Sequence, residues 1–447
     1  MADAETQLNL LADLLAAAKK AGADAADAVT YNAASLSVSC RMNELEKLER
    51  AESNDLGLRV FIGKQQAMVS STDFDSSTLN EVVERAVAMA KAAPEDAYCG
   101  LAEPDQLVTD PPVIEMHDDT EPSNDALIEA ARIAEDAARA VPGITNTEGA
   151  ETAWSQAQIA IATSNGFAQA YSTSSHSLAA SVLAGEGTAM ERDYDYTSAV
   201  YYADLEDPAE IGRQAGERAV KRLNAKKVKT QQVPVIYDPR VSGGLIGHYA
   251  GGINGSSIAR GTSFLKDSMG EKIFSDGINI IDDPHRPRGF RSKPFDAEGL
   301  ANGKRAIAEN GVLTTWVLDL SAARQLDLES TGNASRGTSS PPSPSVTNLY
   351  MEAGTQTPVD LMADIENGFY ITELIGMGIN MITGDYSRGA TGFWIENGEI
   401  TYPVSEMTIA GSMKDMFANL VPADDLVFRY GTDAPTIRID GMTVAGV

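Results

Sequence analysis

The amino-acid sequence predicts an α+β protein in two parts. The N-terminal part has helices flanking antiparallel strands, and the C-terminal part is a β-rich domain. Helical periodicity alternates with β-rich stretches over residues 1–225. A polar, basic break follows at residues 224–232, and beyond it the chain is rich in glycine and short β-branched or aromatic runs. We therefore predict an N-terminal α+β domain over residues 1–225 and a C-terminal β-rich domain over residues 233–447.

The first elements are a helix and a group of strands. Residues 8–24 carry apolar side chains at helical spacing and end near Gly22, a common helix stop. Strands separated by turn signals come next. They are predicted over residues 27–40, 45–51, 56–62 and 65–71, with turns at Asn54-Asp55 and Gly63-Lys64. A second helix is predicted over residues 76–93, opening at Ser76 or Ser77.

The same order then recurs. A helix is predicted over residues 123–141 with Ser123 as its N-cap. A long hairpin over residues 152–185 turns at Asn165-Gly166, and a strand over residues 194–205 leads to a helix over residues 207–223. Because helix, strands and helix occur twice, we predict a duplicated α+β unit. Chance recurrence of a common pattern is the alternative.

The C-terminal part predicts short strands and one long loop. Strands are expected over residues 233–238, 392–404 and 436–444. Residues 333–346, "NASRGTSSPPSPSV", cannot form a strand or helix interior, because the prolines lack a donor and the serines favour turns. Long loops in compact domains are often functional or mobile, although a plain surface loop is equally compatible with this composition.

Charge and composition exclude several classes of protein. The net charge of −29 argues against wrapping nucleic acid or lying on an anionic membrane, and it favours cationic partners. The N-terminus lacks the features of a signal peptide, and no apolar run approaches the ~20 residues that span a bilayer. Two cysteines, Cys40 and Cys99, are too few for a disulfide framework or a cysteine-rich zinc site. We expect a cytoplasmic protein that contacts neither membrane nor nucleic acid.

Short catalytic motifs are missing. None of the histidines is followed by glutamate, and no three spaced metal ligands emerge. The histidines are His117, His176, His248 and His285. Ser263 and Lys266 have the Ser-x-x-Lys spacing in which a lysine deprotonates a serine on one helical face, but the companion motifs of that enzyme class are absent. "GMGINM" has Met381 where a dinucleotide fingerprint needs its third glycine.

Longer stretches carry a resemblance. "GGLIGHYAGGINGSSIARGTSF", "GFYITELIGMGINMITGDYSRGATGFWIENG" and the ending "TIRIDGMTVAG" resemble the TldD/PmbA family, and within it the PmbA branch, also called TldE. In the N-terminal half, "GADAADAV" and "LGLRVFIG" are similar to the family as well. The resemblance implies a peptidase system. The TldD branch holds a catalytic zinc with a His-Glu-x-x-x-His stretch and a cysteine near its C-terminus, and it pairs with the PmbA branch to degrade small, unfolded peptides.

Against that pattern the site is degenerate. Gly243 stands at the first histidine, Gly244 at the glutamate and His248 at the second histidine, and the C-terminal stretch has no cysteine. A single imidazole does not retain Zn²⁺, because catalytic sites use about three protein ligands. Without metal or carboxylate nothing generates a hydroxide at neutral pH. We therefore expect no catalytic residue, no metal and no cofactor on this chain, with zinc on a TldD-type partner.

The resemblance implies a TldD-type paralogue as heterodimer partner, or a second copy in a homodimer, with peptides as substrates. Polar residues near the degenerate motif are candidates for lining the substrate cavity. They are Ser256, Ser257, Arg260, Asp385, Tyr386, Ser387 and Arg388. A helix cap for the first three and a tight turn with a salt bridge for the rest are the structural alternatives. A homodimeric peptide-binding or scaffold protein without protease activity, and a Ser263/Lys266 hydrolase, remain the competing functions.

Overall fold

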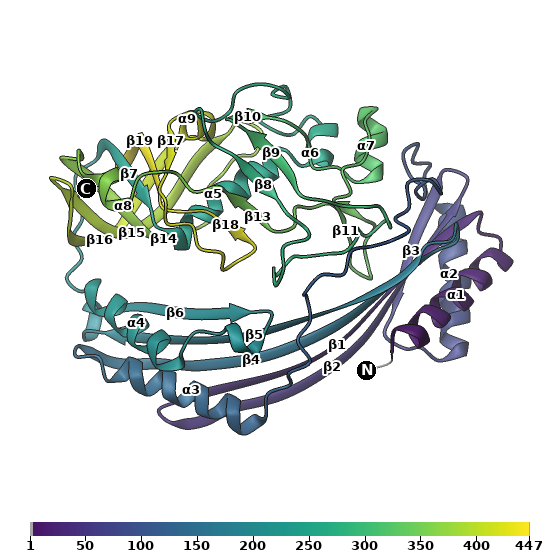
Figure 1. Ribbon diagram of the computed structural model, residues 1–447, viewed down its shortest axis with the longest axis horizontal. Coiled ribbons are helices and arrows are strands. Elements are labelled where there is room, and N and C mark those ends of the chain that lie inside the picture. Colours follow the sequence, from purple (N-terminus) through teal and green to yellow (C-terminus); the bar gives the residue numbers. More distant parts are fainter. Residues whose placement is uncertain (1–2, 447) are drawn as a thin grey trace.

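The computed structural model describes residues 3–446 and has two layers (Figure 1). A long, curved antiparallel sheet with helices on its outer side forms one layer, and a β-rich C-terminal body lies above it. The predicted fold class is confirmed. Within the described residues no helix is both long enough and apolar enough to cross a membrane.

The N-terminal strands form one sheet in the order β3-β2-β1-β4-β5-β6, antiparallel throughout. The strand bounds are β1 Ala25–Arg41, β2 Glu44–Ile62, β3 Gln65–Ser71, β4 Ile144–Thr163, β5 Ala168–Ala184 and β6 Glu191–Ala199. β1 and β4 are neighbours at the centre, so two units of helix, three strands and helix meet there. The repeated element order seen in the sequence is thus also present in space.

All helices of these units pack on one face of the sheet. Their bounds are α1 Ala4–Lys20, α2 Ser76–Ala92, α3 Asn124–Arg139 and α4 Pro208–Lys221. Ala28 of β1 packs in the cluster under α1 and α2, and Leu36 of the same strand packs under α3 and α4. Because side chains alternate along a strand, Val29 points to the opposite face, where it packs against Phe295 of the C-terminal body.

Two details differ from the sequence prediction. The expected strands 45–51 and 56–62 are one strand, β2, and the chain does not turn at Asn54-Asp55. Asn54 pairs with Asn32 and Asp55 with Tyr31, because the uninterrupted β1 offers partners along this whole length and overrides the local turn preference. The helix predicted to open at Ser76 or Ser77 begins at Ser76, but its N-cap is Asp75.

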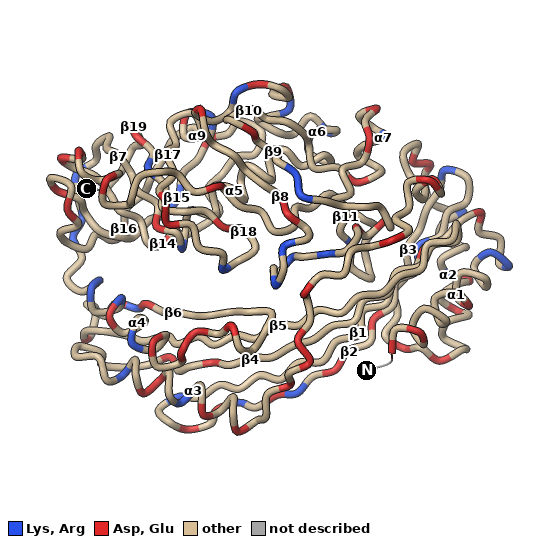
Figure 2. The backbone as a smooth tube through the Cα atoms, viewed as in Figure 1, with Lys and Arg blue, Asp and Glu red and all other residues tan. Residues whose placement is uncertain are grey.

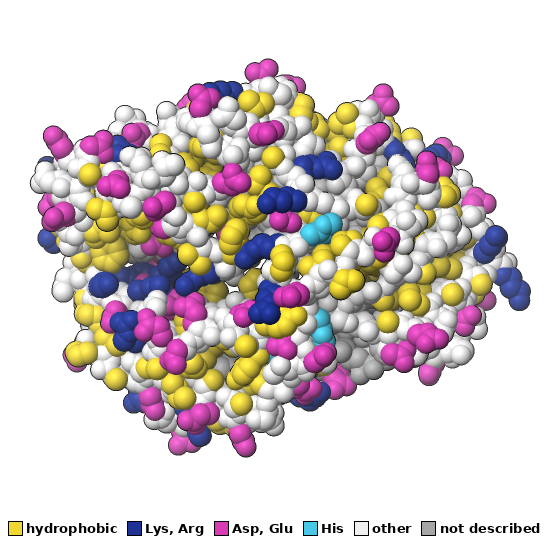
Figure 3. Space-filling model, viewed as in Figure 1, with side chains coloured by type: hydrophobic (Ala, Val, Ile, Leu, Met, Phe, Trp, Pro, Cys, Tyr) yellow, Lys and Arg dark blue, Asp and Glu magenta, His cyan; other side chains and the backbone are white. Residues whose placement is uncertain are grey.

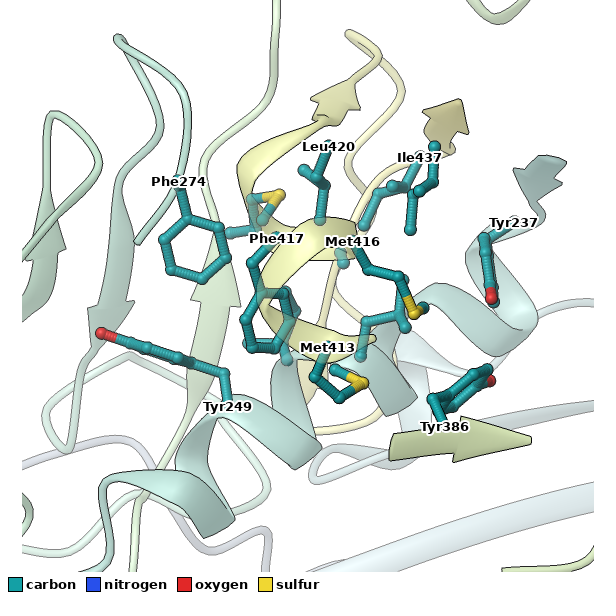
Figure 4. Close-up of a cluster of buried hydrophobic side chains, with 14 of the residues drawn as sticks. Tyr237, Tyr249, Phe274, Tyr386, Met413, Met416, Phe417, Leu420 and Ile437 are labelled. Carbon is teal, nitrogen blue, oxygen red and sulfur yellow. The ribbon is translucent and has the colours of Figure 1, made fainter. Parts of the chain in front are cut away.

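A barrel forms the core of the C-terminal body. Strands β16, β15, β14, β7 and β19 follow one another, and β16 pairs with β19 to close the ring. Their bounds are β7 Gln231–Tyr237, β14 Asn367–Ile375, β15 Asp385–Glu396, β16 Glu399–Ser412 and β19 Ile437–Ala445. Figure 4 shows Met413, Met416 and Phe417 of α9 (Met413–Ala418) among buried side chains that include Tyr249 of α5 (Pro239–Gly252) and Tyr386 of β15.

A second sheet, in the order β10-β9-β8-β13-β18, lies beside the barrel. Its bounds are β8 Ile280–Asp282, β9 Arg305–Glu309, β10 Val312–Leu313, β13 Leu349–Met351 and β18 Thr432–Asp433. Shorter elements are α6 Gly255–Ala259, α7 Leu320–Leu326, α8 Pro358–Met362, β17 Leu420–Pro422 and the 3₁₀ turns Gly187–Ala189 and Tyr202–Asp204. Residues 333–346 are a loop, apart from a short pairing of β11 (Ala334–Ser335) with β12 (Ser343–Pro344).

Candidate functional site

The stretch predicted to be a degenerate metal motif lies on α5. Asp238 caps this helix by accepting a hydrogen bond from the Arg240 backbone N–H at 2.9 Å, and Pro239 occupies its first turn. Gly243, Gly244 and His248 all belong to this helix. Its preceding strand β7 belongs to the barrel, so the motif is held on rigid elements.

The two glycines differ in the space around them. A Cβ atom at Gly243 would lie 2.6 Å from the Thr432 carbonyl oxygen of β18, a distance that Cβ atoms do not adopt. A Cβ atom at Gly244 would have nothing within 4 Å. A histidine side chain at position 243 therefore requires β18 to move, whereas position 244 lacks only the side chain.

His248 is half-buried beside β15. Its ring centroid lies 6.0 Å from that of Tyr386, and its Nε2 is buried without a hydrogen-bond partner among residues 3–446. Burial, and then the nearby Arg388 guanidinium, lower the pKa of His248. The imidazole is thus neutral at neutral pH and has a cation as its neighbour. The residues at this position do not fit a zinc ion. Within the described part of the chain, no three His, Cys, Asp or Glu side chains come together to hold one.

The predicted substrate-lining residues fall in two places. Asp385, Tyr386, Ser387 and Arg388 begin β15, where Tyr386 is buried and Asp385 is exposed. Ser256 and Ser257 lie on α6, and Arg260 is its C-cap. Ser256 lines a separate cavity of about 170 Å³ that also contains Cys99 and Glu298. Of the predicted residues, Tyr386 and Arg388 lie beside His248.

Ser263 has a structural role. Its buried Oγ donates to the Gly252 carbonyl at 2.5 Å and accepts from the Leu265 N–H at 3.0 Å. Lys266 is exposed, and both residues lie in a turn and not on a helix. The Ser-x-x-Lys spacing thus brings no lysine to the serine. Of the other histidines, His117 lies near Asp119 and His176 near Asp118, and the Nε2 of His285 lies 2.7 Å from Asn302 Oδ1.

A cavity of about 700 Å³ lies between the two layers, and no sequence motif predicted it. The N-terminal sheet contributes its helix-free face, and the C-terminal body contributes the 290–297 segment and the 333–346 loop. The lining residues are Val29, Tyr31, Asp55, Ile159, Ile161, Tyr171 and Thr173 from the sheet, and residues 290–293, 297, 335–338, 345 and 346 from the body. The proline- and serine-rich composition of the loop was the one signal in the sequence that pointed here.

Lys and Arg positions gather on the side of the C-terminal body that faces the sheet (Figure 2). The cavity is lined by Arg291, Lys293 and Arg336 but by one acidic residue, Asp55. Arg336 is buried and pairs with Asp27 of β1, which also pairs with Arg59 of β2. In a chain with a net charge of −29, this cavity is a local concentration of positive charge.

A second hollow of about 450 Å³ separates α4 and β6 from the barrel. In the space-filling view, basic side chains gather in this gap between the α4 and β6 end of the sheet and the barrel (Figure 3). Of the three basic residues that line the second hollow, the two arginines are ion-paired: Arg240 contacts Asp193 at 2.9 Å, and Arg218 pairs with Asp195. Two carboxylates, Asp193 and Asp238, also line this hollow, whereas the cavity near Lys293 is lined by three basic residues and one acidic residue.

Comparison with known proteins identifies the family. The chain matches the models of three consecutive domains of the PmbA/TldA metallopeptidases. They are domain 1 over residues 26–90, the central domain over residues 117–223 and the C-terminal domain over residues 230–446. It is 38% identical to the metalloprotease PmbA homolog of Haemophilus influenzae over 432 residues, covering 96% of this chain and 94% of the relative. It is 37% identical to metalloprotease PmbA of Escherichia coli O157:H7, covering 97% of this chain and 94% of the relative.

Solved structures share the fold over the whole length. A putative modulator of DNA gyrase from Bacteroides thetaiotaomicron superimposes with a TM-score of 0.92 at 28% identity, covering 100% of both chains. TldE from Thermococcus kodakarensis superimposes with a TM-score of 0.87 at 22% identity, covering 98% of this chain and 100% of that one. From its sequence relatives, its three matched domains and its fold, this chain belongs to the PmbA/TldD metallopeptidase family, in the PmbA branch.

Proposed function

We propose that this chain is the non-catalytic subunit of a zinc metallopeptidase that degrades small, unfolded peptides in the cytoplasm. Its partner is a TldD-type paralogue, which carries the zinc ion. The observation that carries the proposal is the Thr432 carbonyl oxygen, 2.6 Å from where a Cβ atom at Gly243 would stand. The space that a first histidine would need belongs to the backbone of β18.

The chemistry of the other two positions supports the same assignment. Gly244 has no carboxylate to act as a general base. His248 is a lone neutral imidazole beside Arg388, and one ligand falls short of the roughly three that a catalytic zinc site requires. No hydrolytic step is assigned to residues of this chain.

A non-catalytic subunit contributes binding and enclosure. Its acidic surface attracts cationic peptides over a distance. Its β-rich body suits extended chains, which add to a strand edge through backbone hydrogen bonds that tolerate many sequences. Enclosing the partner's zinc site between two subunits admits unfolded chains and excludes folded proteins.

Peptide hydrolysis tests the proposal directly. An unstructured peptide is incubated with the purified chain alone, with a TldD-type paralogue alone, and with both, each with and without a chelator. We expect no cleavage by the chain alone and chelator-sensitive cleavage by the mixture. Chelator-sensitive cleavage by the chain alone, after contaminating protease is excluded, contradicts it. Peptide binding with no gain in cleavage on mixing identifies a stand-alone binding protein instead.

A further inference from the structure

We infer that the 700 Å³ cavity between the layers binds a carboxylate attached to an apolar group, namely the C-terminal end of a peptide. The chemistry of the cavity carries the carboxylate and the apolar group. The assignment to a peptide rests on the function proposed above.

Lys293 supplies a positive charge that the chain does not neutralise. Its Nζ donates to Ser335 Oγ at 3.2 Å, and no carboxylate among the described residues lies within 4.0 Å of it. Burial lowers the pKa of Lys293; at longer range Asp296 and Asp282 favour its charge, and Arg291 opposes it. A carboxylate in the cavity would give this ammonium the direct partner it lacks, and charge-assisted hydrogen bonds are the strong ones.

Two guanidinium groups add positive charge to the cavity wall. Arg336 has a side chain that is 1% exposed, and its Nε is buried with no hydrogen-bond partner among residues 3–446. Its guanidinium pairs with Asp27, which also pairs with Arg59, so one carboxylate is shared by two buried cations and the wall keeps a net positive charge. Arg291 is exposed, donates to Thr432 Oγ1 at 3.2 Å and has no carboxylate partner in the described part of the chain.

The opposite wall is apolar. Val29 and Ile161 are 4% and 3% exposed and line the cavity from the sheet, whereas Tyr31 is 43% exposed and is accessible from solvent. Tyr171 lines the same wall and packs edge-on against Phe295 at 5.4 Å. A multiply charged oxyanion would be desolvated against these side chains without partners. A single carboxylate on an apolar body matches both walls, and the volume lies within the roughly 300–1,000 Å³ of ligand sites.

The loop that closes the cavity is fitted to the sheet. A Cβ atom at Gly57 of β2 would lie 2.2 Å from the Thr338 carbonyl oxygen, so the 333–346 loop reaches the sheet because this position is glycine. Arg336, which belongs to the same loop, pairs with Asp27 of β1. The cavity is thus built by contacts between the layers.

The test is a binding measurement on the purified chain without a peptidase partner. Fluorescence anisotropy follows an N-terminally labelled, unstructured nonapeptide that ends in leucine, with either a free or an amidated C-terminus. We expect the free acid to bind about tenfold more tightly or better, as expected for a charge-assisted contact. Lys293→Met should abolish this preference. The matched control Lys272→Met, an exposed lysine paired with Asp276, should keep it.

Further measurements distinguish loss of the carboxylate site from a folding defect, and a peptide ligand from a small carboxylate. Arg291→Gln, at an exposed site, should reduce the preference for the free acid about threefold even if Lys293→Met fails to fold. Unlabelled N-acetyl-leucine competing as well as the peptide would overturn the peptide assignment in favour of a small apolar carboxylate. Equal affinity for acid and amide overturns the inference as a whole. That result leaves the cleavage test of the proposed function untouched, and failure of that cleavage test leaves the carboxylate preference standing.

Discussion

Helix α5 and the cavity between the layers differ in opposite ways: one has a recognisable sequence motif without room for a metal ligand at position 243, and the other has room and charge for a ligand without a motif. The α5 site keeps a family motif in one continuous stretch of sequence, but Thr432 occupies the space at Gly243, and His248 has Arg388 for a neighbour. The cavity has no motif, and its two walls come from segments more than 100 residues apart, yet it presents cations without ion-pair partners in the described part of the chain opposite an apolar wall. The stretch of sequence that resembles the family motif and the cavity with binding capacity therefore lie in different places, because binding capacity depends on which segments the fold brings together.

The largest expected effect breaks the contact that joins the layers. Asp27→Asn leaves Arg59 and Arg336, both buried, without their counter-ion, which should cost about 3–5 kcal/mol in the free energy of unfolding. Denaturant unfolding at pH 7 measures this, with Asp55→Asn at the cavity wall as a near-neutral control. A loss no larger than that of the control would show that the layers do not depend on this contact.

The same residue gives a pH dependence. Burial alone would raise the pKa of Asp27, but Arg336 and Arg59 together hold the pKa below its ordinary value. A lowered folded-state pKa stabilises the fold above the unfolded pKa of about 3.9, and this contribution disappears as the pH falls through the folded value. The difference between Asp27→Asn and the natural chain should therefore shrink in acid. A constant difference down to pH 3 would contradict the assignment.

Gly57→Ala tests whether the loop shapes the cavity. The new Cβ would clash with the Thr338 carbonyl oxygen, so we expect a loss of about 1–3 kcal/mol and a weaker preference for the free-acid peptide. Thermal unfolding and the anisotropy assay measure the two effects. Normal peptide preference in a destabilised variant would mean that the loop supports the fold but not the cavity.

Adjacent glycines on α5 form a matched pair. Gly243→Ala should lose about 1–2 kcal/mol, because the clash with Thr432 exceeds the helix propensity that alanine gains. Gly244→Ala should gain about 0.5–1 kcal/mol, since its Cβ meets nothing within 4 Å and alanine favours a helix. Chemical denaturation of both variants checks the sign. Equal stabilisation would show that β18 leaves room for a ligand at position 243.

The smallest effect concerns the remaining histidine. His248→Leu should change the free energy of unfolding by less than about 0.5 kcal/mol, because Nε2 has no partner among the described residues to lose. Cleavage by the mixture with a TldD-type paralogue should be unchanged. A large loss of cleavage with stability intact would give His248 a direct role in the shared site.

Prediction from sequence succeeded where local signals act alone. The helices over 123–141 and 207–223 were placed within a few residues, with Ser123 as the N-cap of α3, because capping and helical spacing are local properties. The hairpin turn at Asn165-Gly166 was correct for the same reason. The turn at Asn54-Asp55 failed, because pairing with β1 supplies more hydrogen bonds than a local turn. Nothing in the sequence reveals the barrel closure between β16 and β19, which are joined only in space.

The sequence by itself determined the fold class and the family, and it predicts that Gly243 and Gly244 stand where the family motif has a histidine and a glutamate. Those properties depend on residue identity and short-range order. Only the tertiary structure decided that Thr432 fills the space at position 243, and that Lys293 and Arg336 face an apolar sheet without enough carboxylates to balance them. The physical reason is that steric room and electrostatic compensation depend on distances between segments remote in the chain, and those distances exist only once the two layers have packed.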